Sequence, residues 1–156
     1  MRLVGTGLLV LSFLVGAARV GWTACGDNPG DNQAVIDARA AAEATCGPCD
    51  SAANHGAYVK CVAGVANDRA SAEPPTLPKN CKGKVKKCAA RSTCGKPGAV
   101  RCCITKNGVT KCKITKDAQK CADKAGSAIG TGSCCSNTQP MTTDACNASP
   151  SGAFLE

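Results

Sequence analysis

The spacing of apolar residues predicts three short helices in the first half of the chain. Residues 33–45 are rich in alanine and contain neither proline nor glycine, a composition typical of a helix. Asn54 is a residue type that caps helices, and the apolar residues after it recur at helical spacing: Tyr58, Cys61, Val62 and Val65. Beyond the prolines at 74, 75 and 78, a third helix is expected from about 78 to 91. Its apolar face comprises Cys81, Val85, Cys88 and Ala89.

From Val100 onward the pattern changes to a period of two, which predicts a β-hairpin. Residues 100–105 and 109–115 flank Asn107-Gly108, a strong signal for a tight turn. A two-residue loop places Cys103 opposite Cys112, whereas a three-residue loop with a bulge places Cys102 there. In either register, one cysteine of the adjacent pair can form a disulfide across the hairpin. Residues 116–125 are compatible with another short helix, and the chain from 126 is expected to be loop held by disulfides.

Large apolar side chains are too few for this chain of 156 residues to fold on hydrocarbon burial alone. Burying an aliphatic side chain contributes about 1.5–3 kcal/mol, whereas ordering each residue costs about 1.5 kcal/mol. Each disulfide adds about 2–4 kcal/mol by restricting the unfolded chain. The fourteen cysteines therefore indicate a disulfide framework formed in an oxidising compartment. They are Cys25, Cys46, Cys49, Cys61, Cys81, Cys88, Cys94, Cys102, Cys103, Cys112, Cys121, Cys134, Cys135 and Cys146.

The distribution of cysteines favours one stapled domain over two independent ones. Seven cysteines lie in residues 25–94 and seven in 102–146, so complete pairing requires an odd number of bridges between the halves. Two pairs of cysteines are adjacent in the sequence, Cys102-Cys103 and Cys134-Cys135. Neither pair is expected to form a disulfide within itself, because so small a ring strains the linking peptide. We therefore expect a small, disulfide-rich α+β domain over 25–146. It comprises an acidic helical part (25–73) and a basic helix-hairpin part (78–146), and a flexible tail follows (147–156).

Residues 1–24 have the pattern of an export signal. Arg2 precedes an apolar run over 3–15, which is too short to span a bilayer, and small residues at 16–18 offer a cleavage site. This pattern predicts a secreted or periplasmic protein. The alternative is a lipoprotein anchored at Cys25, although the residues before Cys25 match a lipidation motif poorly.

Positive charge is concentrated in the second half of the chain. Residues 79–124 contain fourteen Lys or Arg against two Asp, a balance of +12, whereas residues 25–73 carry three basic and seven acidic residues, a balance of −4. Such asymmetry favours anionic partners, polysaccharide or lipid head groups among them. Specific nucleic-acid recognition is disfavoured, because the basic stretch has no aromatic residue and few arginines. The candidate anion-binding residues are Lys82, Lys84, Lys86, Lys87, Lys111 and Lys113. The ordinary alternative is a solvated lysine face that keeps the protein soluble.

Cys46-Gly47-Pro48-Cys49 has the letters of a thioredoxin-like redox motif. In that motif the first cysteine lies at a helix N-terminus, whose dipole stabilises the thiolate. Here the predicted helix precedes Cys46, so the dipole opposes the thiolate and structural cysteines are favoured. No metal site or cofactor is predicted, since the spacings provide no second CxxC and the single histidine, His55, completes neither a zinc nor a haem motif.

Several stretches of the chain share features with one known group of sequences. They are NHGAYVKCV (54–62), Leu77-Pro78 before CKGKVKKCAARSTCGKPG, the pair Cys102-Cys103, and KCKITKDAQKC (111–121). Together they resemble an uncharacterised exported cysteine-rich module of environmental bacterial genomes, over roughly residues 25–135. No activity or ligand is known for that module, so the resemblance implies only a bacterial, exported, disulfide-rich protein.

These features favour an exported, non-enzymatic structural or binding protein that contacts anionic polymers of the cell envelope or the extracellular space. Two alternatives belong to other classes. One is a thiol–disulfide oxidoreductase that uses Cys46 and Cys49, and the other is a secreted cationic toxin-like protein.

Overall fold

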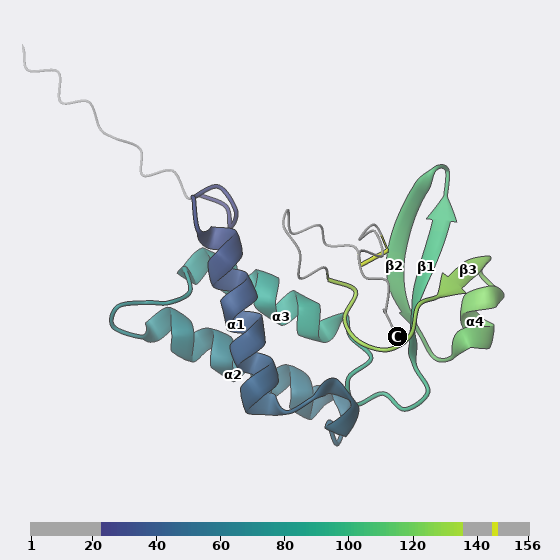
Figure 1. Ribbon diagram of the computed structural model, residues 1–156, viewed down its shortest axis with the longest axis horizontal. Helices are drawn as coiled ribbons and strands as arrows, with labels where there is room; N and C mark the ends of the chain where they lie inside the picture. Colours follow the sequence, from purple (N-terminus) through teal and green to yellow (C-terminus); the bar gives the residue numbers. More distant parts are fainter. Residues whose placement is uncertain (1–22, 136–144, 147–156) are drawn as a thin grey trace, which may run out of the picture.

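The computed structural model describes residues 23–135 and 145–146 of the protein. Most of the predicted export signal (1–24) and the whole predicted tail (147–156) lie outside the described residues. Figure 1 shows two parts side by side: a group of helices, and a small sheet with one short helix. The α+β class expected from the sequence is confirmed. Among the described residues, no helix is long and apolar enough to cross a membrane.

The helical part contains the three helices that the sequence predicts. They are α1 (Asp31–Cys46), α2 (His55–Ser71) and α3 (Lys82–Ala90), with single 3₁₀ turns at Cys49–Ser51 and Lys79–Cys81. Asn54 caps α2, because its side-chain oxygen accepts a hydrogen bond of 2.8 Å from the backbone N–H of Ala57. Local sequence chemistry therefore determines where this helix begins.

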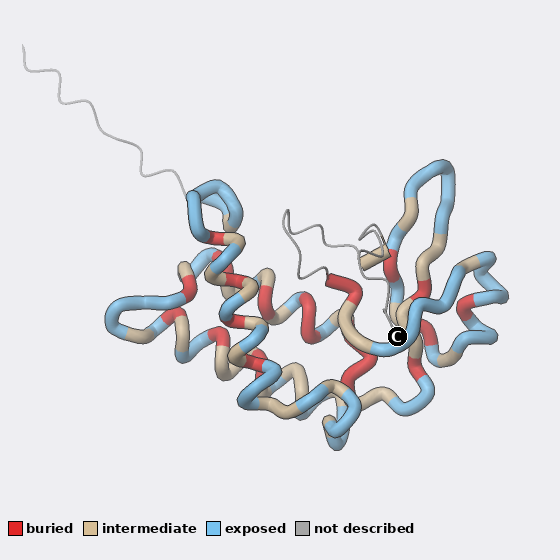
Figure 2. The backbone as a smooth tube through the Cα atoms, in the orientation of Figure 1, coloured by how far each residue is buried: buried red, intermediate tan, exposed pale blue. Residues whose placement is uncertain are grey.

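One small hydrocarbon core holds the three helices together. Its largest fully buried side chains are Val35 of α1, Val85 of α3 and Leu77 from the segment between α2 and α3. Alanines of α1 and α2 complete the core, and their small side chains let the two helices approach closely. In Figure 2 the buried residues of this part lie along the facing sides of the helices. The apolar face predicted for α3 is confirmed, since Cys81, Val85, Cys88 and Ala89 are all buried.

The sheet part is a predicted hairpin extended by a strand that the sequence did not indicate. Strands β1 (Val100–Lys106) and β2 (Val109–Thr115) pair antiparallel, and β3 (Gly126–Ala128) pairs antiparallel with β1, in the order β2-β1-β3. Asn107 and Gly108 both have positive φ, as the tightest hairpin turns require. The two-residue loop places Cys103 opposite Cys112, one of the two predicted registers.

Two elements follow the hairpin. Helix α4 (Ala118–Ala122) lies within the short helix expected over 116–125. The expectation that everything from 126 is loop was wrong at β3. This strand is only three residues long, too short for an alternating pattern to reveal it. Its place depends on Gly126, since a Cβ atom there would lie 2.5 Å from the sulphur of Cys102.

All fourteen cysteines are paired, and the adjacent pairs do not close on themselves, as expected. Three disulfides lie in the first half: Cys25–Cys81, Cys46–Cys61 and Cys49–Cys94. Three lie in the second half: Cys102–Cys121, Cys103–Cys146 and Cys112–Cys134. One bridge, Cys88–Cys135, joins the halves. This agrees with the odd number of joining bridges that seven cysteines in each half require.

The expected disulfide across the hairpin is not formed, for either of the two candidate cysteines. Cys103 does face Cys112, but each bonds instead to a segment that returns over the sheet, at Cys146 and Cys134. Cys102 bonds to Cys121 of α4. The hairpin is already closed by its turn and its backbone hydrogen bonds, so the disulfides connect it to neighbouring elements instead.

A short bridge-like contact supports the single disulfide between the two parts. The segment after α3 pairs with residues 132–134: the N–H of Thr93 donates to the carbonyl of Gly132 at 3.0 Å, and the N–H of Cys134 donates to the carbonyl of Arg91 at 2.9 Å. The hydroxyl of Ser133 donates to the carbonyl of Cys88 at 2.9 Å. These hydrogen bonds position the end of α3 against the sheet part.

Candidate anion-binding surface

The six lysines predicted to bind anions fall into two groups. Lys82, Lys84, Lys86 and Lys87 lie on α3, and Lys111 and Lys113 lie on β2. Because the opposite face of α3 is buried against α1 and α2, its lysines are directed away from the core. The structure therefore does not bring all six together, and the two groups must be considered separately.

Two lysines of the α3 group line a hollow that is more open to solvent than that of the β2 group. Lys84 and Lys87 lie one turn apart and line a surface hollow with Gly83, Asn80 and the chain around Cys25. Lys86 instead donates a hydrogen bond of 3.1 Å to the side-chain oxygen of Asn67 on α2. Part of this group thus contacts the neighbouring helix, which is a structural role and not anion binding.

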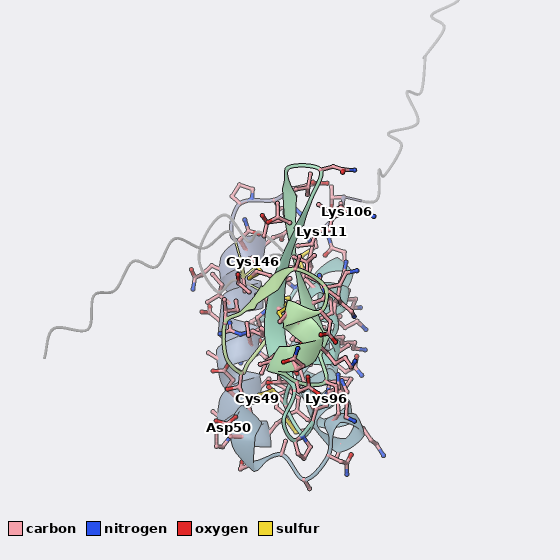
Figure 3. The ribbon with its side chains drawn as sticks, turned by 90° about the vertical axis from the view of Figure 1, so that its right-hand side faces the viewer. Cys49, Asp50, Lys96, Lys106, Lys111 and Cys146 are labelled. Atoms are coloured by element: carbon pink, nitrogen blue, oxygen red, sulfur yellow. A yellow bond between two sulfur atoms is a disulfide. The ribbon has the colours of Figure 1, made fainter. Side chains whose placement is uncertain are left out.

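The β2 group lines a hollow that contains two further cations. This basic hollow, with a volume of about 540 Å³, lies between the end of α3 and the free edge of β2. Its charged lining residues are Arg91, Lys96, Lys111 and Lys113, and no acidic residue of the described chain lines it. The remaining lining residues are Ala90, Cys112 and Ile114. Figure 3 shows Lys96 and Lys111 toward the same side of the sheet part, with Asp50 toward the other.

Arg91 and Lys96 are positioned by backbone contacts at the junction. Arg91 donates a hydrogen bond of 2.8 Å to the carbonyl of Cys112, which connects the end of α3 to β2. The backbone N–H of Lys96 donates to the carbonyl of Thr93 at 2.8 Å, and its ammonium lies 3.3 Å from the carbonyl of Ser92. Sequence reasoning did not single out these two residues, since their approach to β2 depends on the turn that follows α3.

The charges of this hollow have an ordinary structural explanation as well as a functional one. β2 is an edge strand, and lysines on edge strands discourage pairing with other chains. That explanation accounts for Lys111 and Lys113. It does not account for Arg91 and Lys96, which lie outside the sheet and add two charges to the same hollow. Lys120 of α4 forms an ion pair of 3.1 Å with Asp123, and neither residue lines this hollow.

The Cys-Gly-Pro-Cys sequence does not form the redox arrangement that its letters suggest. Cys46 ends α1, as predicted, and bonds to Cys61 of α2, whereas Cys49 bonds to Cys94 after α3. A thioredoxin-like motif requires a disulfide between its own two cysteines. Here the two sulphurs belong to separate bridges, which attach the end of α1 to both neighbouring segments.

The remaining candidate chemistry also has structural explanations. His55 begins α2, and its Nδ1 lies 2.9 Å from the carbonyl of Cys94, so its hydrogen bond is long-range rather than local. Cys25 and Cys81 lie near Asp31, but the two sulphurs form a disulfide and the carboxylate accepts the N–H of Gly26 at 2.9 Å. A lipid anchor on Cys25 would need the sulphur that is bonded to Cys81.

Comparison with models of protein families, with curated proteins and with solved structures finds no match to this chain. The fold and the basic hollow are therefore interpreted from the residues of the chain alone. The resemblance to an exported cysteine-rich module stays a prediction.

Proposed function

We propose that this chain is exported and acts as a non-enzymatic, disulfide-stapled module whose basic hollow binds an acidic polysaccharide of the cell envelope or the extracellular space. The observation that carries the proposal is the meeting of four cationic side chains around one hollow without an acidic side chain among its described lining residues. They come from three places in the chain, namely the end of α3, the turn after it, and β2.

Export is supported by the cysteines and by the start of the sequence. Seven disulfides persist only in an oxidising environment, which points outside the cytoplasm. The charged and apolar pattern of residues 1–24 is that of an export signal. A non-enzymatic role is supported by the commitment of every cysteine to a disulfide with another element, which leaves no thiol to act as a nucleophile.

The chemistry of the hollow favours polysaccharide over nucleic acid or lipid. Three of its four cations are lysines, which interact with carboxylates and sulfates as point charges along a polymer. Single-stranded nucleic acid also needs aromatic side chains for stacking, and none lines this hollow. A lipid surface is best bound by basic residues combined with large apolar groups that enter the membrane. The apolar lining of this hollow is limited to Ala90, Cys112 and Ile114, so it offers little for insertion into a membrane.

Two charge-reversal variants on immobilised alginate, a linear polymer of uronic acids, test the proposal. The first variant is Lys96→Glu with Lys111→Glu and Lys113→Glu. The second, matched in charge, is Lys106→Glu with Lys116→Glu and Lys124→Glu, three exposed lysines that do not line the hollow. We expect the first variant to lose most of its retention in a NaCl gradient and the second to keep most of it.

Three outcomes would contradict the proposal. Equal losses in the two variants would show that only net charge matters, and unchanged retention of the first variant would exclude the hollow. Binding to vesicles containing anionic phosphatidylglycerol but not to alginate, with loss in the first variant alone, would assign the hollow to lipid instead.

A further inference from the structure

A second, more enclosed cavity lies at the junction of the two parts, apart from the basic hollow. It has a volume of about 250 Å³, and α1, α2 and α3 line one side. Arg101 of β1 lines the other side together with Gly132, Ser133 and Cys135. Its polar side chains are those of Arg39, Glu43, Tyr58, Ser92, Arg101 and Ser133. The two guanidinium groups come from opposite halves of the chain, so the cavity exists only when both parts are folded and joined.

The two terminal nitrogens of the Arg101 guanidinium group contact backbone carbonyls, which hold this side chain in place. One terminal nitrogen, Nη2, donates to the carbonyl of Ile129 at 2.9 Å, and the other, Nη1, lies 3.4 Å from the carbonyl of Ser133. Its Nε is buried and has no acceptor among the described residues. A buried donor normally has an acceptor, and the Nε edge of a guanidinium is suited to a carboxylate, which can accept two parallel hydrogen bonds.

Arg39 contributes a second positive charge from α1. Its Nη2 donates to the sulphur of Cys88 at 2.7 Å, and burial lowers the pKa of this guanidinium, although arginine stays charged at neutral pH. Glu43 follows one turn later on α1. Burial first, and the charge of Glu43 second, raise the pKa of Tyr58, so the hydroxyl keeps its proton and can donate. The cavity thus combines two cations, one anion and neutral hydroxyl groups.

We propose that this junction cavity binds the carboxylate group of a small organic monoanion, with Arg101 and Arg39 as its charged contacts. The two arginines and Glu43 leave an excess of one positive charge, which matches one carboxylate better than a dianion. The volume limits the ligand to a small molecule rather than a polymer chain. This site is independent of the basic hollow, with which it shares no lining residue.

NMR titration of the natively oxidised, ¹⁵N-labelled protein tests the inference with the smallest suitable probe. Sodium acetate is compared with acetamide, its neutral counterpart, at constant ionic strength. We expect saturable shifts for acetate in the millimolar range, centred on the backbone amides of Ser92, Gly132 and Ser133, and none for acetamide. Shifts confined to the amides of the basic hollow, equal shifts with both probes, or no saturable shift would overturn the inference.

Two variants locate the binding group. Arg101→Lys keeps the charge but not the planar fork, and we expect acetate to bind at least about fivefold more weakly. Glu43→Gln removes the competing anion from an exposed position, and we expect acetate to bind about two- to threefold more tightly. If Arg101→Lys fails to fold, the acetate affinity of Glu43→Gln alone tests the proposed site. Unchanged or weaker binding in Glu43→Gln would then refute the site.

Discussion

The helical part and the sheet part are stabilised by different means. In the helical part, a contiguous hydrocarbon core that includes Val35, Leu77 and Val85 is fully buried between the helices, and disulfides reinforce it. In the sheet part, the most deeply buried side chains are cysteines: Cys102, Cys112, Cys121 and Cys134. Disulfides therefore supplement a core in one part and form the core in the other.

This difference has a cause in the composition of the two parts. Half of the residues of β1 (VRCCITK) and β2 (VTKCKIT) are lysine, arginine or threonine, so few large apolar side chains are available for burial. Large hydrophobic residues of this part are even exposed, as Val109 at the hairpin turn and Ile129 after β3 are. A sheet of three short strands needs an additional source of stability, and buried disulfides provide it. Three predicted effects on stability test this difference, in order of decreasing size, and a fourth compares the lysines of the two parts.

The largest effect is expected from removing one disulfide in the sheet part. Cys102→Ala with Cys121→Ala removes a bridge across 19 residues, and Cys46→Ala with Cys61→Ala removes one across 15 residues. Loop entropy differs between the two by only about 0.2 kcal/mol. Because Cys102 and Cys121 are fully buried, we expect the sheet variant to cost about 2 kcal/mol more in free energy of unfolding. Urea denaturation followed by circular dichroism measures both costs. Equal costs would mean that burial of the sulphurs contributes nothing.

The next effect concerns the hydrocarbon core. Leu77→Ala empties a fully buried site in the helical part and should cost about 2–4 kcal/mol. Hydrogen exchange should accelerate at the amides of α1, α2 and α3 while β1 and β2 keep their protection, because one disulfide and a short segment join the parts. Val109→Ala, at an exposed residue, is the control. Equal acceleration in both parts would show that they unfold as one cooperative unit.

A smaller and more local effect is expected at Gly126. Gly126→Ala would place a Cβ atom against the sulphurs of the Cys102–Cys121 bridge, at 2.5 and 3.0 Å, and should cost about 1–3 kcal/mol. Loss of protection should concentrate in β3 and α4. Gly64→Ala in α2 is the matched control, since no atom beyond its own stretch of helix lies within 4 Å of the added Cβ and alanine favours the helix. If Gly126→Ala is as stable as the native protein, the packing of β3 against this disulfide is wrong.

The smallest effect is on anion binding, not on stability, and it concerns the lysines of α3. Reversing Lys82, Lys84, Lys86 and Lys87 to Glu should reduce retention on alginate less than reversing the three lysines of the basic hollow. The reason is that the α3 lysines are spread over an outer helix face, and Lys86 already contacts Asn67. Elution in a NaCl gradient compares the two variants directly. A larger loss in the α3 variant would move the anion-binding surface to that helix.

Local chemistry explains which elements the sequence predicted. Asn54 and the dipeptide Asn107-Gly108 act on their own neighbours, and both mark element boundaries correctly. The cysteine pairings and β3 depend instead on which distant segments pack together, and no local signal encodes that. The same holds for the candidate sites. Lys111 and Lys113 were predicted from charge, but the approach of Arg91 and Lys96 to them follows from the turn after α3.

The central claim is that the two parts are separately stapled and joined through a single bridge, and non-reducing tryptic digestion followed by mass spectrometry tests it most directly. The pairing predicts three disulfide-linked groups of peptides. In the third group, the α3 peptide 88–91 is linked to the four cysteine peptides of the sheet part, 102–106, 112–113, 121–124 and 125–156. In the other two groups, every cysteine belongs to the first half of the chain. One group links peptide 20–39 to peptide 80–82, and the other links peptide 40–60 to peptides 61–69 and 92–101. A peptide of these two groups linked to the sheet part, or a bridge between Cys46 and Cys49, would contradict the account.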